Sequence, residues 1–456
     1  RFASVTSLSS AGSDHRLTPC GLSRMKVAAP RRTFSLAVRK RTALYPQETT
    51  HMRKTTGWLS VLLAGLLAGC GGGGNGNGVL APQVLPVQGA SANTNLNVDI
   101  SAVLGNRYYF TDRTNASVDV FDTKTGAQVA QIKGTGALAF AGQGSSNGTS
   151  GPDGLSVVGN LLYAGDVNSV KVIDPSTNTV TKNIVVGTEN VRADESCVDA
   201  THNLYFVAIP EAATPYVTVI NTQTQTVVGN ITFTDPAGNP SAGLEQCQYD
   251  TASDTFYVNN DGTTANPHGE LIKIPGASIR GITAGGTVNY TALAGAVGYA
   301  EGNCDPTGLA LGPGTDIAVN CREGTAGAPL ELLILNRTSG SILATLNAGG
   351  GDQLWYAPER NRYYSAASRW TSSGKSSGAS CTTASPCLPR LISIDAASRT
   401  IAGMADTGNN AHSVASDPVT SNIFLPISSD AAPAGCPTCR RGTAGLLMFK
   451  PPLDVL

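Results

Sequence analysis

Acidic residues and cysteines recur together in this sequence at intervals of roughly 50 residues. The three pairs are Glu195 with Cys197, Glu245 with Cys247, and Glu301 with Cys304. Carboxyl groups that lie close together can act as general acids or bases, or bind a divalent cation through their oxygens. A cysteine can be a nucleophile, a metal ligand or half of a disulfide. Which role applies depends on the elements that position these residues.

The elements around the pairs also repeat. Seven short segments rich in Tyr, Phe, Val and Ile have the composition of β-strands, and most are followed by an apolar strand that ends in Asp or Asn. An Asp or Asn suits a turn there, because its side chain can bond the backbone two residues further on. The segments are residues 107–112, 161–166, 204–207, 255–260, 316–320, 362–366 and 422–426. A period of about 40–60 residues is typical of four-stranded propeller blades.

Each blade needs an innermost strand just before its aromatic one. The candidates are residues 155–158, 197–199, 247–250, 308–311, 354–356 and 413–416. The last blade has only three strands before the chain ends, and residues 84–87 could supply the fourth, which would leave no open sheet edge. The sequence therefore predicts an all-β fold, a single seven-bladed β-propeller over residues 80–452, with six or eight blades as the alternatives.

The N-terminal region is typical of an exported protein. Residues 52–69 combine a basic start, an apolar run at 58–68 and small residues at the end, which indicates a signal peptide too short to span a membrane. The ending Leu67-Ala-Gly-Cys70 resembles the bacterial lipoprotein cleavage box, so Cys70 is the expected lipidation site; a plain signal peptide is the alternative. Residues 1–51 are interpreted as an over-extended reading frame, and 70–79 as a Gly-rich tether to the membrane.

The charge distribution narrows the choice of partners. Residues 1–54 hold 11 of the 31 Lys and Arg but 2 of the 32 Asp and Glu, so the part from Cys70 onward carries 20 basic and 30 acidic residues, a net charge of −10. An acidic surface excludes nucleic acid as an expected partner, because phosphate binding requires basic residues. We expect a monomer in the bacterial cell envelope, periplasmic or surface-exposed.

The repeated strand, Asp/Asn turn and second strand resemble the YVTN-repeat propellers of bacterial envelope proteins. Residues 151–156 and 305–311 are also similar to a turn signature of that family and of the gluconolactonase-type propellers. That second resemblance implies a metal-dependent hydrolase with Glu, Asn and Asp ligands for Ca²⁺ or Mg²⁺. The metal would polarise a carbonyl group and activate a bound water.

In a propeller, the loops that enter the innermost strands meet around one channel opening. The candidate catalytic residues there are Glu195, Glu245, Asp352 and His412, and the candidate metal ligands are Glu195, Glu245, Glu301, Asn303 and Asp153. Crowded carboxyl groups can retain a raised pKa or be neutralised by a cation. The alternative is a solvated acidic channel mouth without chemistry.

Eight cysteines remain once Cys20 and Cys70 are set aside, an even number that suits disulfides in an exported protein. Cys197 and Cys247 are expected on the innermost strands of adjacent blades, and Cys304 and Cys321 on neighbouring strands of one blade. The other candidates are Cys381 and Cys387, which bracket a loop, and the local pair Cys436 and Cys439.

Aromatic and basic residues suggest a further ligand contact. Trp355 falls on an innermost strand, whereas Arg369 and Trp370 follow an aromatic strand and begin the long loop 365–389. An aromatic ring and a guanidinium over a channel could stack on a sugar or hold a carboxylate. The first functional hypothesis is therefore a binding module for a small molecule, glycan or envelope protein. A lactone or ester hydrolase is the second, and a structural part of an envelope complex is the third.

Overall fold

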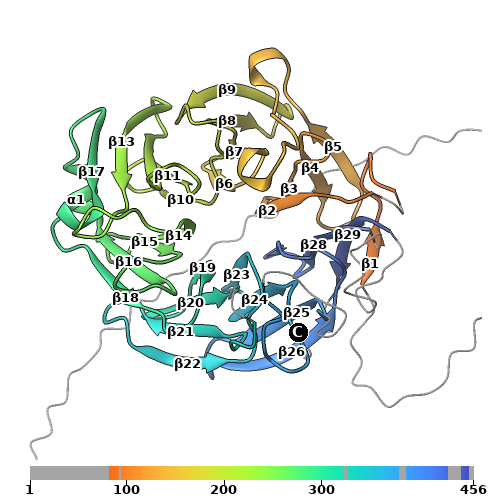
Figure 1. Cartoon of the computed structure of the whole chain (residues 1–456). Coiled ribbons are helices and arrows are strands. Elements are labelled where there is room, and N and C mark those ends of the chain that lie inside the picture. The colour runs from red at the N-terminus through yellow and green to blue at the C-terminus, as the bar shows by residue number, and fades with distance from the viewer. Residues whose placement is uncertain (1–81, 92–93, 323–325, 379–386, 430–442, 451–456) are drawn as a thin grey trace, which may run out of the picture. The chain divides into compact units, whose positions relative to one another are not determined.

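A computed structural model describes residues 82–91, 94–322, 326–378, 387–429 and 443–450. These residues form seven sheets, antiparallel apart from one added edge strand, and Figure 1 shows them arranged in a ring around one central axis. The predicted all-β, seven-bladed propeller is confirmed. Contacts divide the chain into residues 1–72 and 73–456, and all of the described residues lie in the second unit.

The strands of each blade follow one another from the channel outward. The first four blades are β2 to β5 (Val98–Leu104, Arg107–Asp112, Ser117–Asp122, Gln128–Ile132), β6 to β9 (Leu155–Val158, Leu161–Asp166, Ser169–Asp174, Thr179–Val185), β10 to β13 (Ser196–Asp199, Leu204–Ile209, Tyr216–Asn221, Thr226–Thr232), and β14, β15, β16 and β18 (Leu244–Asp250, Thr255–Asn260, Glu270–Pro275, Val297–Ala300). The last three are β19 to β22 (Pro306–Leu311, Asp316–Cys321, Leu332–Asn336, Ile342–Leu346), β23 to β26 (Leu354–Ala357, Arg362–Ala367, Arg390–Asp395, Thr400–Asp406), and β27, β28 and β29 with β1 (Ala415–Ser416, Ile423–Ile427, Gly445–Phe449, Gln83–Leu85).

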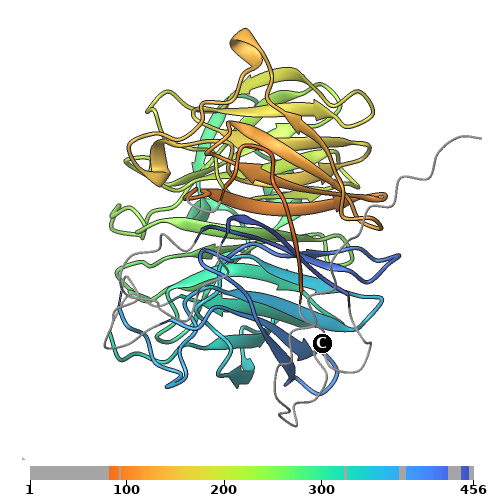
Figure 2. The same ribbon diagram turned by 90° about the vertical axis from the view of Figure 1, so that its right-hand side faces the viewer.

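The ring is closed by the N-terminal strand, as predicted, although this strand is β1 (Gln83–Leu85) rather than residues 84–87. β1 pairs antiparallel with β29, and Gln83 lies opposite Met448. In Figure 2 the first blade, in orange, and the last blade, in dark blue, lie next to each other. The outer edge of the last blade is therefore covered by a strand from the other end of the described chain.

One insertion departs from the regular pattern. Between β16 and β18 the chain forms α1 (Gly276–Arg280), β17 (Gly286–Asn289) and the 3₁₀ turn η3 (Tyr290–Ala292). β17 pairs parallel with β13, so the third blade gains a fifth strand from the chain segment of the fourth. Two other 3₁₀ turns, η1 (Gly136–Leu138) and η2 (Asn147–Thr149), lie between the first and second blades.

The core lies between blades. Every residue of β11 and of β15 is buried, whereas the outer strand β9 alternates between buried and exposed positions. The second strand of each blade is covered by a neighbouring blade on both faces, which explains its aromatic and β-branched composition. Each blade therefore depends on its two neighbours for burial.

Two glycines allow the blades to approach each other near the channel. A Cβ on Gly154 would lie 1.8 Å from the carbonyl oxygen of Asp194, and one on Gly308 would lie 2.0 Å from that of Asp352. Both glycines belong to the turn signatures singled out in the sequence. Their missing side chains allow each acid-bearing segment to pack against the preceding blade.

Candidate functional site

A cavity of about 140 Å³ lies at one end of the channel. We call it the mouth cavity; its lining includes Asp99, Glu195, Glu245, Asp352 and His412. These residues stand at or just before the beginnings of innermost strands, so one face of the ring collects them from different blades. Every lining residue except Gly351 has a polar side chain.

The structure brings the four candidate catalytic residues together. Glu195, Glu245, Asp352 and His412 all line the mouth cavity. Glu195 is 4% exposed, and its carboxyl group has no hydrogen-bond or ion-pair partner among the described residues. A buried, unpaired carboxyl group that faces a cavity is available to a ligand.

The metal candidates do not gather in the same way. Asp153 is fully buried behind the cavity lining and bonded to Arg113. Glu301 follows β18, at the outer edge of the fourth blade, and Asn303 is an exposed residue of the next loop. The expectation that Glu301 shares the channel opening with Glu195 and Glu245 is wrong, because the segment that carries it is still crossing from the outer strand towards the next innermost strand.

Arginines balance the carboxylates, and of these only Arg369 was a candidate from the sequence. Arg113, Arg192, Arg322 and Arg369 all line the mouth cavity. The Arg113 Nη2 to Asp99 Oδ2 distance is 2.6 Å, Arg192 Nη2 to Asp194 Oδ2 is 2.6 Å, and Arg322 Nη1 to Glu245 Oε1 is 3.7 Å. The mouth cavity therefore carries interleaved charges of both signs rather than a ring of acids.

Arg113 lies between two carboxyl groups and affects them unequally. Burial raises the pKa of Asp99, but Arg113, His412 and Arg192 outweigh it and hold that pKa well below its usual range. Burial raises the pKa of Asp153 to about 8 despite the opposing charge of Arg113, and its Oδ2 has no partner in the described part of the chain. Of the two carboxyl groups that contact Arg113, that of Asp99 is thus the ionised one.

The two glutamates are shifted in the direction expected for an acid catalyst or a neutral hydrogen-bonding group. Burial raises the pKa of Glu195 well above its ordinary value, and the charges of Asp352, Asp99 and Glu245 add to this shift. Burial and Asp261 raise the pKa of Glu245 as well, with Arg322 opposing. Protonated carboxyl groups both donate and accept hydrogen bonds, which broadens the polar groups they can bind.

His412 is fixed as a double donor. Its Nδ1 lies 2.8 Å from the carbonyl oxygen of Asn410, and its Nε2 lies 3.1 Å from that of Val98. Carbonyl oxygens only accept, so both ring nitrogens must carry hydrogen. Burial lowers the pKa of His412, but the contact with Asp99 and the charges of Asp352 and Asp99 outweigh it and raise that pKa. The two contacts to carbonyl oxygens and the raised pKa both favour the imidazolium form of the ring.

The lining fits a divalent cation poorly. Asp99, Asp352 and His412 each place one potential ligand atom within 4.8 Å of the others. Both nitrogens of His412 are already donors, however, and a metal ligand needs a free nitrogen lone pair. Four guanidinium groups lie on the same cavity and would repel a cation. The geometry therefore favours a polar ligand over a metal centre.

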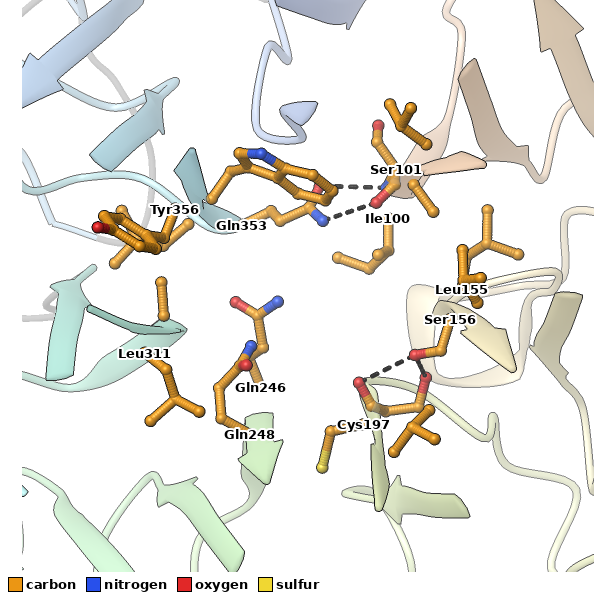
Figure 3. Close-up of a pocket in the computed structure, with 18 of the residues that line it drawn as sticks. Ile100, Ser101, Leu155, Ser156, Cys197, Gln246, Gln248, Leu311, Gln353 and Tyr356 are labelled. Carbon is orange, nitrogen blue, oxygen red and sulfur yellow. Dashed lines mark hydrogen bonds between the residues drawn. The ribbon is translucent and has the colours of Figure 1, made fainter. Parts of the chain in front are cut away.

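A second cavity, of about 500 Å³, lies further along the channel. We call it the channel cavity; it is lined by innermost strands from the first six blades and reaches their far ends at Val103, Val198 and Leu311 (Figure 3). Trp355 lines this cavity, whereas Arg369 lines the mouth cavity. The structure therefore does not bring Trp355 and Arg369 together at one ligand site.

Trp370 packs inside the structure. It is partly buried against the core between the fifth and sixth blades, and the guanidinium of Arg390 lies 5.3 Å from its ring centroid. It lines neither of the two channel cavities. Its position indicates a packing role.

Four of the candidate cysteines form two disulfides, although Cys304 precedes β19 rather than lying on it. Cys197 is bonded to Cys247 across the innermost strands of the third and fourth blades, and Cys304 to Cys321 within the fifth. Cys387 is also disulfide-bonded. The candidates Cys381, Cys436 and Cys439 lie outside the described residues. All five cysteines that the structure describes are therefore in disulfide bonds.

Comparison with known proteins supports the fold. The structure is similar to a solved structure of hydrazine synthase from Kuenenia stuttgartiensis, with a TM-score of 0.55 and 14% sequence identity, over 81% of this chain and 100% of that chain. The chain is a seven-bladed β-propeller. No family model and no curated protein matches the sequence. At this identity the likeness to hydrazine synthase concerns the fold alone.

The predicted export signals lie outside the described residues. These are the segments 1–51, 52–69 and 70–79, with Cys70. Among the residues that the structure describes, no helix has the length and apolarity needed to cross a membrane.

Proposed function

We propose that this propeller is a lipid-anchored cell-envelope module that binds a polar small molecule or a glycan in the mouth cavity. The observation that supports this best is the convergence of Glu195, Glu245, Asp352 and His412 on one polar cavity. Glu195 is buried there without a partner among the residues that the structure describes, which is unfavourable unless a ligand or water uses it. The YVTN-like repeat and the lipoprotein-like ending at Cys70 support the envelope location.

The interleaved charges suggest the ligand class. Arg322 and Arg369 offer donors, while Asp352 offers acceptors on the same cavity. A ligand rich in hydroxyl groups, or one that carries both charges, can satisfy both sets at once. A strongly cationic or anionic ligand would meet repulsion from one of them.

The test is a thermal-shift screen of the full chain against glycans, polyols and zwitterions. We expect hits that are lost in a Glu195→Gln, Asp352→Asn double variant. The matched control is Glu359→Gln, an exposed residue in the turn between β23 and β24. Hits that persist in the double variant, or a stable protein partner without any small ligand, would contradict the proposal.

A Ca²⁺- or Mg²⁺-dependent hydrolase of lactones or esters is the second candidate. It is favoured by the raised pKa of Glu195 and Glu245 at one cavity. It is disfavoured by the double-donor state of His412 and by the arginines. Turnover of a lactone that is lost in Glu245→Gln would support it over the binding module.

A further inference from the structure

The channel cavity differs chemically from the mouth cavity, although both lie on the same channel. None of its lining residues carries a charge. Its walls combine aliphatic side chains such as Leu155 and Leu311 with the aromatic residues Tyr249, Trp355 and Tyr356. A charged ligand would lose its water there without gaining an ion pair. The cavity therefore selects for uncharged molecules.

Two glutamines of β14 supply fixed polar groups on this wall. The Gln246 Oε1 accepts from the backbone N–H of Leu309 at 2.7 Å, and the Gln248 Nε2 donates to the carbonyl oxygen of Leu309 at 2.9 Å. Together they bond Leu309 as an adjacent strand would. Each side-chain amide is thus anchored to Leu309 through one of its two polar atoms, and this bond fixes the position of its second polar atom.

The remaining atoms of these amides form a complementary pair. The Gln246 Nε2 and the Gln248 Oε1 have no partner among the described residues, so one donor and one acceptor are left over. The two residues are two positions apart on one strand, and Figure 3 shows their side chains next to one another at the cavity. An amide ligand presents the opposite pair, a carbonyl oxygen and an N–H.

A third glutamine does not contribute to this pair. The Gln353 Nε2 donates to the carbonyl oxygen of Ser101 at 2.9 Å, and its Oε1 accepts from Ser101 N, Ser413 Oγ and Val414 N. Its amide is therefore occupied by protein groups (Figure 3). The available donor and acceptor lie on the fourth blade, which localises the polar end of a ligand.

We propose that the channel cavity binds an uncharged molecule with an apolar or aromatic body and an amide group, held by Gln246 and Gln248. This site is separate from the one in the mouth cavity and does not rest on the function proposed for that cavity. The apolar walls would bury the body of the ligand, and the glutamine pair would orient its amide.

Three probes of nearly equal size test this proposal: benzamide, benzoate and benzamidinium. Binding to the full chain is followed by the fluorescence of Trp355 after Trp58 and Trp370 are replaced by Phe. We expect benzamide to bind at least about 10-fold more tightly than either ion, because burying an unpaired charge is strongly unfavourable. Equal affinities for the three probes, or no response to benzamide, would overturn the proposal.

An isosteric variant tests the glutamine pair. Gln246→Glu retains the oxygen that accepts from Leu309 but replaces the free NH₂ by a carboxylate oxygen. We expect benzamide to bind about 10-fold more weakly and benzamidinium to bind better. Gln223→Glu, on an exposed turn, is the matched control and should change neither. Unchanged probe selectivity in Gln246→Glu would contradict the assignment.

A cavity-filling variant covers the case in which Gln246→Glu does not fold. Leu311 is half-buried at the end of β19, so Leu311→Tyr should fill part of the space without adding a second tryptophan to the fluorescence readout. We expect it to abolish benzamide binding. Ligands of the mouth cavity should still bind this variant, so failure at one site is distinguishable from failure at the other.

Discussion

The imidazole of His412 donates from Nε2 to the backbone carbonyl oxygen of Val98, the first residue of β2, at 3.1 Å. This bond joins the last blade to the first near the place where the ring closes. The second hydrogen bond of this side chain, from Nδ1 to the carbonyl oxygen of Asn410, holds the imidazole in position. The protonation state of one side chain is thereby linked to the closure of the propeller.

His412→Gln should destabilise the protein in a pH-dependent way. The folded pKa of His412 is raised, so its stabilisation is complete below the unfolded pKa of about 6.5 and is lost as pH rises through the folded pKa. The difference in unfolding free energy between wild type and variant should be about 1–3 kcal/mol at low pH and smaller at high pH. Denaturant titrations at about pH 5.5 and about pH 9 measure it. A difference that is equal at both pH values would contradict the imidazolium assignment.

Glu195→Gln should have the opposite effect on stability: it should stabilise the protein at high pH. A carboxyl group whose folded pKa lies above its unfolded value destabilises the fold as pH rises through that range. The variant should therefore melt at a higher temperature than wild type at about pH 8, and the gap should close near pH 4. Glu359→Gln, which is exposed, should show no such gap. Lower stability of Glu195→Gln at every pH would mean that the carboxylate is favourably paired in solution.

Gln353→Ala should weaken the junction of the last and first blades. Its side-chain amide pairs with both the N–H and the carbonyl of Ser101, in place of a neighbouring strand, and also accepts from Val414 N. Leaving buried backbone groups unpaired costs about 1–3 kcal/mol. Chemical denaturation should show this loss, whereas Gln223→Ala on an exposed turn should remain near wild type.

The disulfides Cys197–Cys247 and Cys304–Cys321 should contribute unequally to the free energy of unfolding. The bond between Cys197 and Cys247 spans 50 residues, and that between Cys304 and Cys321 spans 17. If loop entropy decides the effect, the disulfide that closes the longer loop should stabilise the folded state by about 1 kcal/mol more. Double alanine variants of each pair, compared by denaturant unfolding, test this. A larger loss from the shorter loop would show that native packing outweighs loop entropy here.

Repetition explains why the fold could be predicted. Each blade has the same buried second strand, so the signal near Tyr108, Tyr205 or Tyr363 recurs seven times, and the observed strands match it closely. The insertion around β17 occurs in a single blade, so no repeated sequence pattern points to it. Its strand also pairs with a different blade from the one that precedes it in sequence, which local patterns do not encode.

The site was only partly predictable for a related reason. The acids of the mouth cavity were found because they precede innermost strands. Arg113, Arg192 and Arg322 were missed, although a signal existed for two of them: Arg113 and Arg322 follow the ends of β3 and β20 directly. The ends of second strands share a face with the starts of innermost strands, so the same reasoning applied to both positions would have found the opposing charges.

The pairing of β1 with β29 has a consequence for biogenesis. During synthesis the N-terminal strand emerges early, but its partner is made only after nearly all the described residues. Until then the growing chain presents unpaired strand edges, which are prone to non-native association. A nascent propeller of this kind would benefit from a holding chaperone until its last strand arrives, and a nonsense mutation before residue 445 would leave a permanently unclosed ring.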